Sequence, residues 1–251
     1  MVQLAFVTLG RGAGPLTAAA VSDTWRRTWP NEAPLEQITG TEGSLAFPFM
    51  GGTGMVGYMP APVPWKDLEG PAQCAWHWPQ AVEVLKVHQS HLIVGIAGKA
   101  GPPKFQAIKL TLLTAAVCAA TRAASGVYWG GSTSVSPADR FIHLAREMTP
   151  DSLPLLSWVE FRVFPSDQRS CWSVFTTGLE ALGLMEIEVR DARGSPDELV
   201  GLVMDIAGYL TQPGVNLKNG DTIGLSAEQK LRAHHVPSAW ARAGNVLWIE
   251  M

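Results

Sequence analysis

Apolar and polar positions divide the first 150 residues into short helices and strands. Apolar runs closed by glycine or proline predict strands at residues 4–10, 90–98 and 125–131, and two strands within 45–65 joined at 51–54. Apolar positions at helical spacing predict helices at residues 13–29, 79–88, 102–124 and 136–148. The order β-α-β-β-α-β over residues 1–98 predicts a ferredoxin-like sandwich.

The last hundred residues hold a second set of elements. The pattern predicts strands at 153–164, 171–177, 184–190, 221–225, 230–236 and 245–251, and one helix at 195–212. In the strand 184–190, apolar residues alternate with Glu186, Glu188 and Arg190, which predicts one buried and one solvated face. Ser195 and Glu198 have the spacing of a capping box at the start of the helix.

Together these elements predict an α+β protein built from two ferredoxin-like α/β sandwich units with mostly antiparallel sheets. The predicted units are residues 1–150 and 151–251, because Pro150 and Pro154 mark a boundary. Both halves contain strands, one long apolar helix and a returning strand, which indicates a degenerate duplication. The alternative is that the two halves form one compact domain.

Composition and charge narrow the class of protein. Apolar residues make up 47% of the chain and charged residues 16%, which excludes a disordered chain. The formal net charge is −3, and the longest basic run is the pair Arg26–Arg27. A nucleic-acid-binding protein needs a basic stripe to neutralise phosphates, so we predict no nucleic-acid partner. The mild acidity favours a basic or neutral partner.

Three features predict a cytoplasmic protein without a membrane segment. Cys74, Cys118 and Cys171 are odd in number and widely spaced, which is typical of reduced thiols. The first apolar run lacks the basic residues that precede it in a signal peptide. The most apolar window, residues 110–120, is too short to span a bilayer.

Cys74, His77, His88 and His91 follow the pattern C-x2-H…H-x2-H, which could supply a tetrahedral zinc site. Zinc ligands usually come in pairs from one knuckle or one helical face, and neither is evident here. We therefore predict that each imidazole bonds nearby backbone at a helix-to-strand corner. The sequence predicts no bound metal and no cofactor.

Glu186 and Glu188 are spaced to lie on one face of a strand, close enough to flank a sugar or bind a cation, with Glu180 upstream. The pattern favours the simpler interpretation that they form the solvated side of an amphipathic strand. The segment 50–57 is glycine-rich, but the prolines after it exclude the helix that a phosphate-binding loop requires, so we predict a hairpin turn. No serine or cysteine has the setting of a catalytic nucleophile.

Tryptophan and proline are concentrated between residues 59 and 78. Trp65, Trp76 and Trp78 lie among prolines, with Asp67 and Glu69 between them. Proline restricts the backbone and tryptophan offers a rigid apolar surface, so this segment suits a preorganised binding edge. We predict these five residues as a partner-binding surface. The alternative is an ordered loop packed over the sandwich.

Several turns, one strand and one helix carry a resemblance to a known family. They are Thr177–Gly178, Gly183, Glu186–Glu188, the 195–210 helix with Tyr209, and Gly220–Gly224. In this order, within TTGLEALGLMEIEV and KNGDTIGLSAEQKL, they resemble the uncharacterised bacterial family catalogued as domain of unknown function 4261. The block with His88, His91 and LIVGI is similar to the family's earlier segment. The resemblance implies a bacterial cytosolic α+β protein with no assigned reaction and supplies no catalytic residue.

These observations leave function hypotheses of different classes. The first is a non-enzymatic binding protein, specifically an immunity protein that neutralises an interbacterial toxin, of the type VI secretion or polymorphic kind, by occluding its active site. It depends on the absence of catalytic motifs, on the mild acidity, and on the surplus of tryptophan, with ten tryptophans against three tyrosines. The alternative is an enzyme or a metal or small-ligand binder that uses His77, His88 and His91. A third is a structural partner in a larger assembly.

Overall fold

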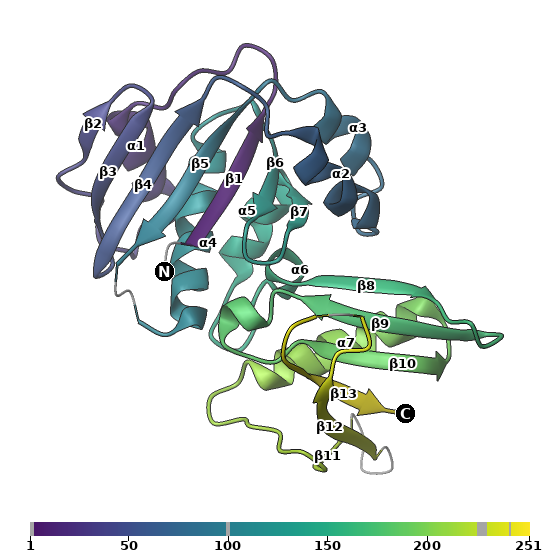
Figure 1. The fold of residues 1–251 in the computed structure, drawn as a ribbon. Helices are drawn as coiled ribbons and strands as arrows, with labels where there is room; N and C mark the ends of the chain where they lie inside the picture. The colour runs from purple at the N-terminus through teal and green to yellow at the C-terminus, as the bar shows by residue number, and fades with distance from the viewer. Residues whose placement is uncertain (1–2, 99–100, 225–229, 241) are drawn as a thin grey trace. The chain divides into compact units, whose positions relative to one another are not determined.

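The computed structural model describes residues 3–98, 101–224, 230–240 and 242–251, and the chain divides into two compact units, Met1–Met148 and Thr149–Met251. The sequence placed the boundary two residues later, at 150. Each unit has its own sheet and its own covering helices (Figure 1).

The first unit is built on a seven-stranded sheet whose neighbouring strands are all antiparallel, in the order β2-β3-β4-β5-β1-β6-β7. The strands are β1 (Gln3–Leu9), β2 (Thr39–Thr41), β3 (Ser44–Phe49), β4 (Gly52–Met59), β5 (Ser90–Ala97), β6 (Ala124–Trp129) and β7 (Ser134–Pro137). The glycine-rich segment 50–57 forms the hairpin between β3 and β4, as predicted, with Met50 and Gly51 at positive φ.

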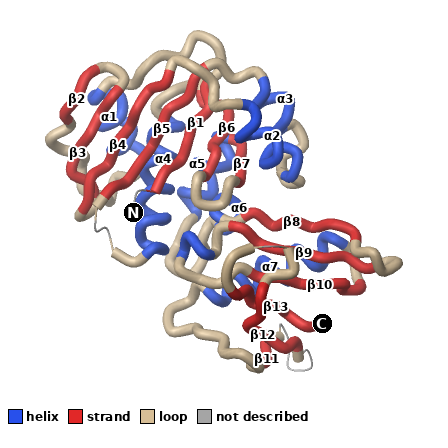
Figure 2. Tube along the Cα trace, viewed as in Figure 1, coloured by secondary structure: helices blue, strands red, loops and turns tan. Residues whose placement is uncertain are grey.

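Helices lie on both faces of this sheet (Figure 2). The helices α1 (Ala18–Thr28), α4 (Pro103–Ala119) and α5 (Ala138–Glu147) pack together on one face. The short helices α2 (Trp65–Cys74) and α3 (Ala81–Lys86) lie on the other face, against β6 and β7. Alternation along β1 serves both layers, because Ala5 and Val7 are fully buried while Phe6 packs towards α2 and α3.

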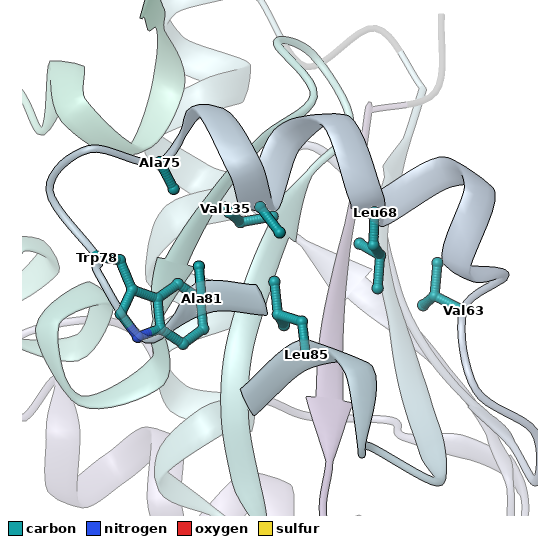
Figure 3. Close-up of a cluster of buried hydrophobic side chains, with 8 residues drawn as sticks. Val63, Leu68, Ala75, Trp78, Ala81, Leu85 and Val135 are labelled. Carbon is teal, nitrogen blue, oxygen red and sulfur yellow. The ribbon is translucent and has the colours of Figure 1, made fainter. Parts of the chain in front are cut away.

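A cluster of buried side chains holds α2 and α3 on the sheet (Figure 3). It consists of Val63, Leu68, Ala72, Ala75, Trp78, Ala81, Leu85 and Val135. A Cβ at Gly126 would lie 2.8 Å from Cη2 of Trp78 and 3.1 Å from Cδ2 of Leu85. Glycine at this position therefore allows the indole to reach the β6 backbone.

The predicted ferredoxin-like strand order is wrong for this unit. In that fold the first strand lies between the third and the fourth, whereas here β5 lies between β4 and β1. Six of the eight residues of β5 are buried, so both faces of this strand lie against packed layers. A strand that is apolar on both faces is suited to the interior of a sheet. The chain between β4 and β5 also forms two short helices over β6 and β7 instead of one crossover helix.

The second unit has a six-stranded sheet in the order β11-β12-β13-β10-β9-β8, with β10 and β13 parallel and the other pairs antiparallel. Its strands are β8 (Glu160–Pro165), β9 (Cys171–Thr177), β10 (Ile187–Arg193), β11 (Thr222–Ile223), β12 (Leu231–Pro237) and β13 (Asn245–Glu250). A short helix, α6 (Leu155–Trp158), and a 3₁₀ turn (Glu180–Leu182) complete it together with α7 (Pro196–Leu210).

The long helix α7 begins where the sequence predicts. The Ser195 hydroxyl accepts from the Glu198 amide at 3.3 Å, and the Glu198 carboxylate accepts from the Ser195 amide at 2.9 Å. Both halves of the capping box are therefore present. Leu199, Val203 and Ile206 bury the helix against β8, β9 and β10.

Two predicted strands of this unit are shorter than expected. The segment 153–164 begins with α6, because Pro154 has a φ of −77°, which suits a helical turn, and the strand starts only at Glu160. The predicted strand 221–225 is reduced to β11, and Leu225 lies outside the described residues.

The α+β class with mostly antiparallel sheets is confirmed. The degenerate duplication is not supported by the topology, because the second sheet has a parallel pair, β10 and β13, and the described strands of the first sheet pair only antiparallel. Over the described ranges, no helix has both the length and the apolar character needed to cross a membrane.

Candidate functional site

One row of side chains runs across five strands of the second sheet. Direct strand pairing places Arg162 beside Phe175, Phe175 beside Glu188, Glu188 beside Trp248, and Trp248 beside His234. The alternate residues on these strands, such as Val174 and Val189, are fully buried on the side that α7 covers. The row therefore lies on the sheet face opposite α7.

The loop between β12 and β13 packs onto this row (Figure 1). Its Trp240 ring lies 5.4 Å from the ring of Phe175 and 5.3 Å from that of Phe164. From the same loop, the Arg242 guanidinium lies 5.0 Å from the centre of the Phe175 ring. We call the set Arg162, Phe175, Arg190, Trp240, Arg242 and Trp248 the arginine–aromatic face.

Three arginines of the face each lie over an aromatic ring. Arg162 lies 5.9 Å from the centre of Phe175, on the same ring as Arg242, and Arg190 lies 5.2 Å from the centre of Trp248. These are distances at which a cation is attracted to the face of a ring. Stacking also holds each guanidinium in one orientation.

Glu188 lies at the centre of the row and is completely buried. Its carboxylate accepts from Arg190 Nη2 at 2.6 Å and Nε at 3.0 Å, from Ser238 Oγ at 2.5 Å and from the Ala239 amide at 3.2 Å. Two of these donors belong to the β12–β13 loop. Glu188 therefore joins strand β10 to the loop that carries Trp240 and Arg242.

Glu186 organises the turn after β9 and is only 7% exposed. It accepts from the amides of Gly178 and Glu180 at 2.7 and 3.1 Å and from Thr176 Oγ1 at 2.7 Å. Arg242 Nη1 lies 3.9 Å away, and the same guanidinium donates to Thr177 Oγ1. Glu186 thus connects the turn to the arginine–aromatic face.

A pocket of about 390 Å³ opens beside this turn. Its charged lining residues are Glu180, Glu186 and Arg242, and its apolar walls come from Leu184, Met185 and Val246. Both oxygens of Glu186 already accept hydrogen bonds from the turn. The pocket therefore offers a shaped recess for a side chain, in which Glu186 is engaged by hydrogen bonds and Glu180 supplies an exposed carboxylate.

The prediction that Glu186 and Glu188 form a solvated strand face is wrong. Both carboxylates are buried because the β12–β13 loop and the turn after β9 cover them and supply donors. Alternation correctly placed Ile187 and Val189 in the core, but it could not show that a loop fifty residues later covers the polar face.

Residues 175–250 match the model of the family described as Domain of unknown function (DUF4261). The match runs from within β9 to the end of β13. No curated protein and no solved structure is significantly similar to the chain.

The DUF4261 segment contains most of the site just described. Phe175, the Glu186 turn, Glu188, Arg190, Trp240, Arg242 and Trp248 all lie within it, while Arg162 on β8 lies outside. The predicted turn Gly220–Thr222 also lies in the segment, where Asp221 Oδ2 accepts from the Lys218 amide at 2.7 Å. Asp221 therefore holds this turn through the backbone, as expected, although its acceptor reaches an amide three residues earlier and the geometry is not that of an Asx turn.

The five residues predicted as a partner-binding edge differ in how far they are exposed to solvent. Trp78 is 6% exposed and belongs to the core cluster, and Trp65 is half-buried against the same cluster. Asp67 and Glu69 are exposed on α2, and Trp76 is 48% exposed. Only the last three are available to a partner, because residues 65–74 fold into a helix that turns its apolar side inwards.

The predicted histidine corner is confirmed as a structural feature. His88 Nε2 accepts from the Val63 amide at 2.8 Å, His91 Nδ1 lies 2.8 Å from the Ala61 carbonyl, and His77 Nε2 lies 3.1 Å from the Val135 carbonyl. His88 and His91 thus bond the segment just before α2, and His77 bonds β7. Among the residues that the structure describes, no three His, Cys, Asp or Glu side chains gather as a metal site would require.

Stability of the first unit is expected to fall as the pH decreases through the usual histidine pKa of 6.5. Burial lowers the pKa of His77, as does the nearby Arg140, and burial lowers the pKa of His91. A histidine whose folded pKa lies below its unfolded pKa takes up its proton first in the unfolded chain, so acid favours unfolding. Chemical denaturation at about pH 7.5 and about pH 5.5 measures the effect.

His91→Gln serves as the comparison for this prediction, since glutamine does not titrate. The variant should lose less stability than the natural chain over the same pH interval. A natural chain that gains stability towards pH 5.5 relative to the variant would contradict the prediction.

Sequence reasoning missed Arg162, Arg190, Trp240, Arg242 and Trp248 as site residues. They come from separate strands and a loop, and only the sheet order brings them together. One signal was available, because Glu160 and Arg162 on β8 and Glu188 and Arg190 on β10 repeat a Glu-x-Arg spacing on strands. That spacing places both charges of each pair on one face of the strand.

Proposed function

We propose that this protein is a non-catalytic binding protein that recognises another protein through the arginine–aromatic face. The observation that carries the proposal is the composition of that face, in which arginines lie over aromatic rings and remain partly exposed. Tryptophan, tyrosine and arginine are the residues that contribute most binding energy in protein interfaces.

The chemistry of the site favours recognition over reaction. Glu186 and Glu188 accept bonds from the backbone and from hydroxyl groups, and Glu188 also pairs with Arg190, so their oxygens are engaged in holding the fold. The rings of Phe164, Phe175 and Trp240 lock the loop in place. A preorganised surface of this kind loses little conformational entropy when a partner binds.

The partner we propose is a toxin that threatens the cell making this protein. In that role the protein is an immunity protein, acting in the cytoplasm by covering the toxin's active site. Compactness, the surplus of tryptophan and the engaged state of the buried carboxylates support this role. The histidine alternative loses support, because His77, His88 and His91 each bond backbone.

The test is protection of cells that express the product of the neighbouring open reading frame. The natural chain should restore growth and co-purify with that product. Trp240→Ala should weaken the complex by about thirty-fold, because truncating an interface hot spot costs about 2 kcal/mol. Trp76→Ala is the matched control, since it removes an exposed tryptophan of the first unit.

Absence of both protection and complex formation would overturn the immunity role. Equal losses for Trp240→Ala and Trp76→Ala would overturn the assignment of the face. Thermal unfolding of both variants separates lost contacts from lost folding.

A further inference from the structure

We propose that the arginine–aromatic face binds an acidic segment of its protein partner, whose carboxylates pair with the outward edges of Arg162, Arg190 and Arg242. This inference rests on the proposed function and specifies the chemistry of the partner. It follows from how the charges are layered in the second unit.

Each arginine of the face has a carboxylate below it. The Arg162, Arg190 and Arg242 side chains are 37%, 25% and 27% exposed, whereas their partners Glu160, Glu188 and Glu186 are 7%, 0% and 7% exposed. In all three pairs the negative group points into the protein and the positive group reaches solvent. The layer that a partner meets is therefore cationic, although the charges of the pairs cancel.

Arg190 can still bond a further acceptor. Glu188 receives bonds from Nε and Nη2 of Arg190, which leaves Nη1 without a described acceptor. A guanidinium carries five N–H donors in a planar fork, and stacking on a ring leaves the outer edge of that plane accessible. Carboxylates match this edge in geometry and charge.

Other charged side chains near the arginine–aromatic face do not belong to it. Arg232 and Glu250 lie opposite each other where β12 pairs with β13, and the Glu250 side chain, 51% exposed, is bonded by His234 at 3.0 Å. Glu180 lines the pocket beside the turn and is not a member of the row. The arginine–aromatic face itself contains three cations and no exposed carboxylate.

A nucleic acid is the less suitable occupant. Arginines and aromatic rings also bind single strands, but that mode needs a positive groove that follows the phosphates. Residues 149–251 contain thirteen acidic and eight basic residues, so the unit as a whole repels a polyanion. A short acidic segment meets the local cationic layer without the long-range repulsion that an extended phosphate chain would meet.

The experiment selects peptides of about twelve residues from a random displayed library on the immobilised full-length chain. We expect the selected peptides to be enriched in Asp and Glu. Arg242→Gln should weaken binding of a selected peptide by about ten-fold, as expected for the loss of a charged pair at an interface. Raising the salt from about 0.05 M to about 0.5 M should weaken it further, because screening acts on exposed charges.

Arg169→Gln is the matched control, because Arg169 is an exposed arginine of the same unit outside the face. It should leave binding within about two-fold, a change too small to reflect a lost interface contact. Arg162→Gln provides a second test should Arg242→Gln fold poorly.

The inference is overturned if the library yields neutral or basic peptides, if it yields none, or if Arg169→Gln weakens binding as much as Arg242→Gln. Displacement of the peptide by an oligothymidine of about twenty nucleotides would assign the face to nucleic acid. A partner that co-purifies through Trp240 while the selected peptides are neutral would overturn this inference alone and leave the proposed function standing.

Discussion

Replacing Glu188 with alanine is expected to lower the free energy of unfolding of the second unit by about 3–5 kcal/mol. The Glu188 carboxylate is fully buried and accepts from Arg190, the Ser238 hydroxyl and the Ala239 amide. The alanine variant leaves these donors without their acceptor and Arg190 without its counter-charge. Chemical denaturation followed by circular dichroism measures the change.

Two further variants make this result specific. Glu180→Ala removes an exposed carboxylate near the same sheet and should change stability by no more than about 0.5 kcal/mol. Glu188→Gln keeps the size of the side chain and part of its bonding, so its loss should be smaller than that of the alanine variant. A loss below about 1 kcal/mol for Glu188→Ala would show that the β12–β13 loop is held by its aromatic contacts alone.

Replacing Trp78 with alanine should cost the first unit about 3–5 kcal/mol, as large-to-small changes of a buried aromatic do. The Trp78 indole fills the space between α3 and the backbone of Gly126 and contacts the core cluster (Figure 3). Thermal or chemical unfolding gives the measurement.

Trp76→Ala is the matched control, because only His77 separates this exposed tryptophan from the buried Trp78. Its effect on stability should stay within about 0.5 kcal/mol, since Trp76 is 48% exposed and contacts the ring of His77. Comparable losses for the two variants would contradict the placement of Trp78 in the core. Loss of partner binding without loss of stability in Trp76→Ala would instead support the edge with Asp67 and Glu69 as an interface.

Local sequence signals predicted individual elements well. The capping box at Ser195 and Glu198, the hairpin at 50–57 and the strand 90–98 are present as expected, because each depends on residues close together in the chain. The helix 102–124 is also present, although it ends at Ala119. The histidine prediction was correct only in part for this reason, because the imidazoles bond backbone as expected but at residues 25 and 30 positions away in the chain.

Strand order was not predictable from such signals. The position of β5 between β4 and β1 brings together strands that are far apart in the chain, and local patterns do not specify such pairings. The arginine–aromatic face has the same origin, because Arg162 and Arg242 are eighty residues apart and reach one Phe175 ring from opposite ends of the unit's sequence.

The sequence alone determined the α+β class, the residues that form the hairpin turn and the helix cap, and the resemblance of the C-terminal part to a known family. These features depend on short-range patterns along the chain. The sequence also showed a mildly acidic chain, and from that it predicted a basic or neutral partner. Only the tertiary structure decided which charges reach solvent: burial of Glu160, Glu186 and Glu188 beneath Arg162, Arg190 and Arg242 turns an acidic unit into one with a cationic face. Composition counts charges, whereas recognition depends on the charges that remain exposed after the loop and the strands have packed.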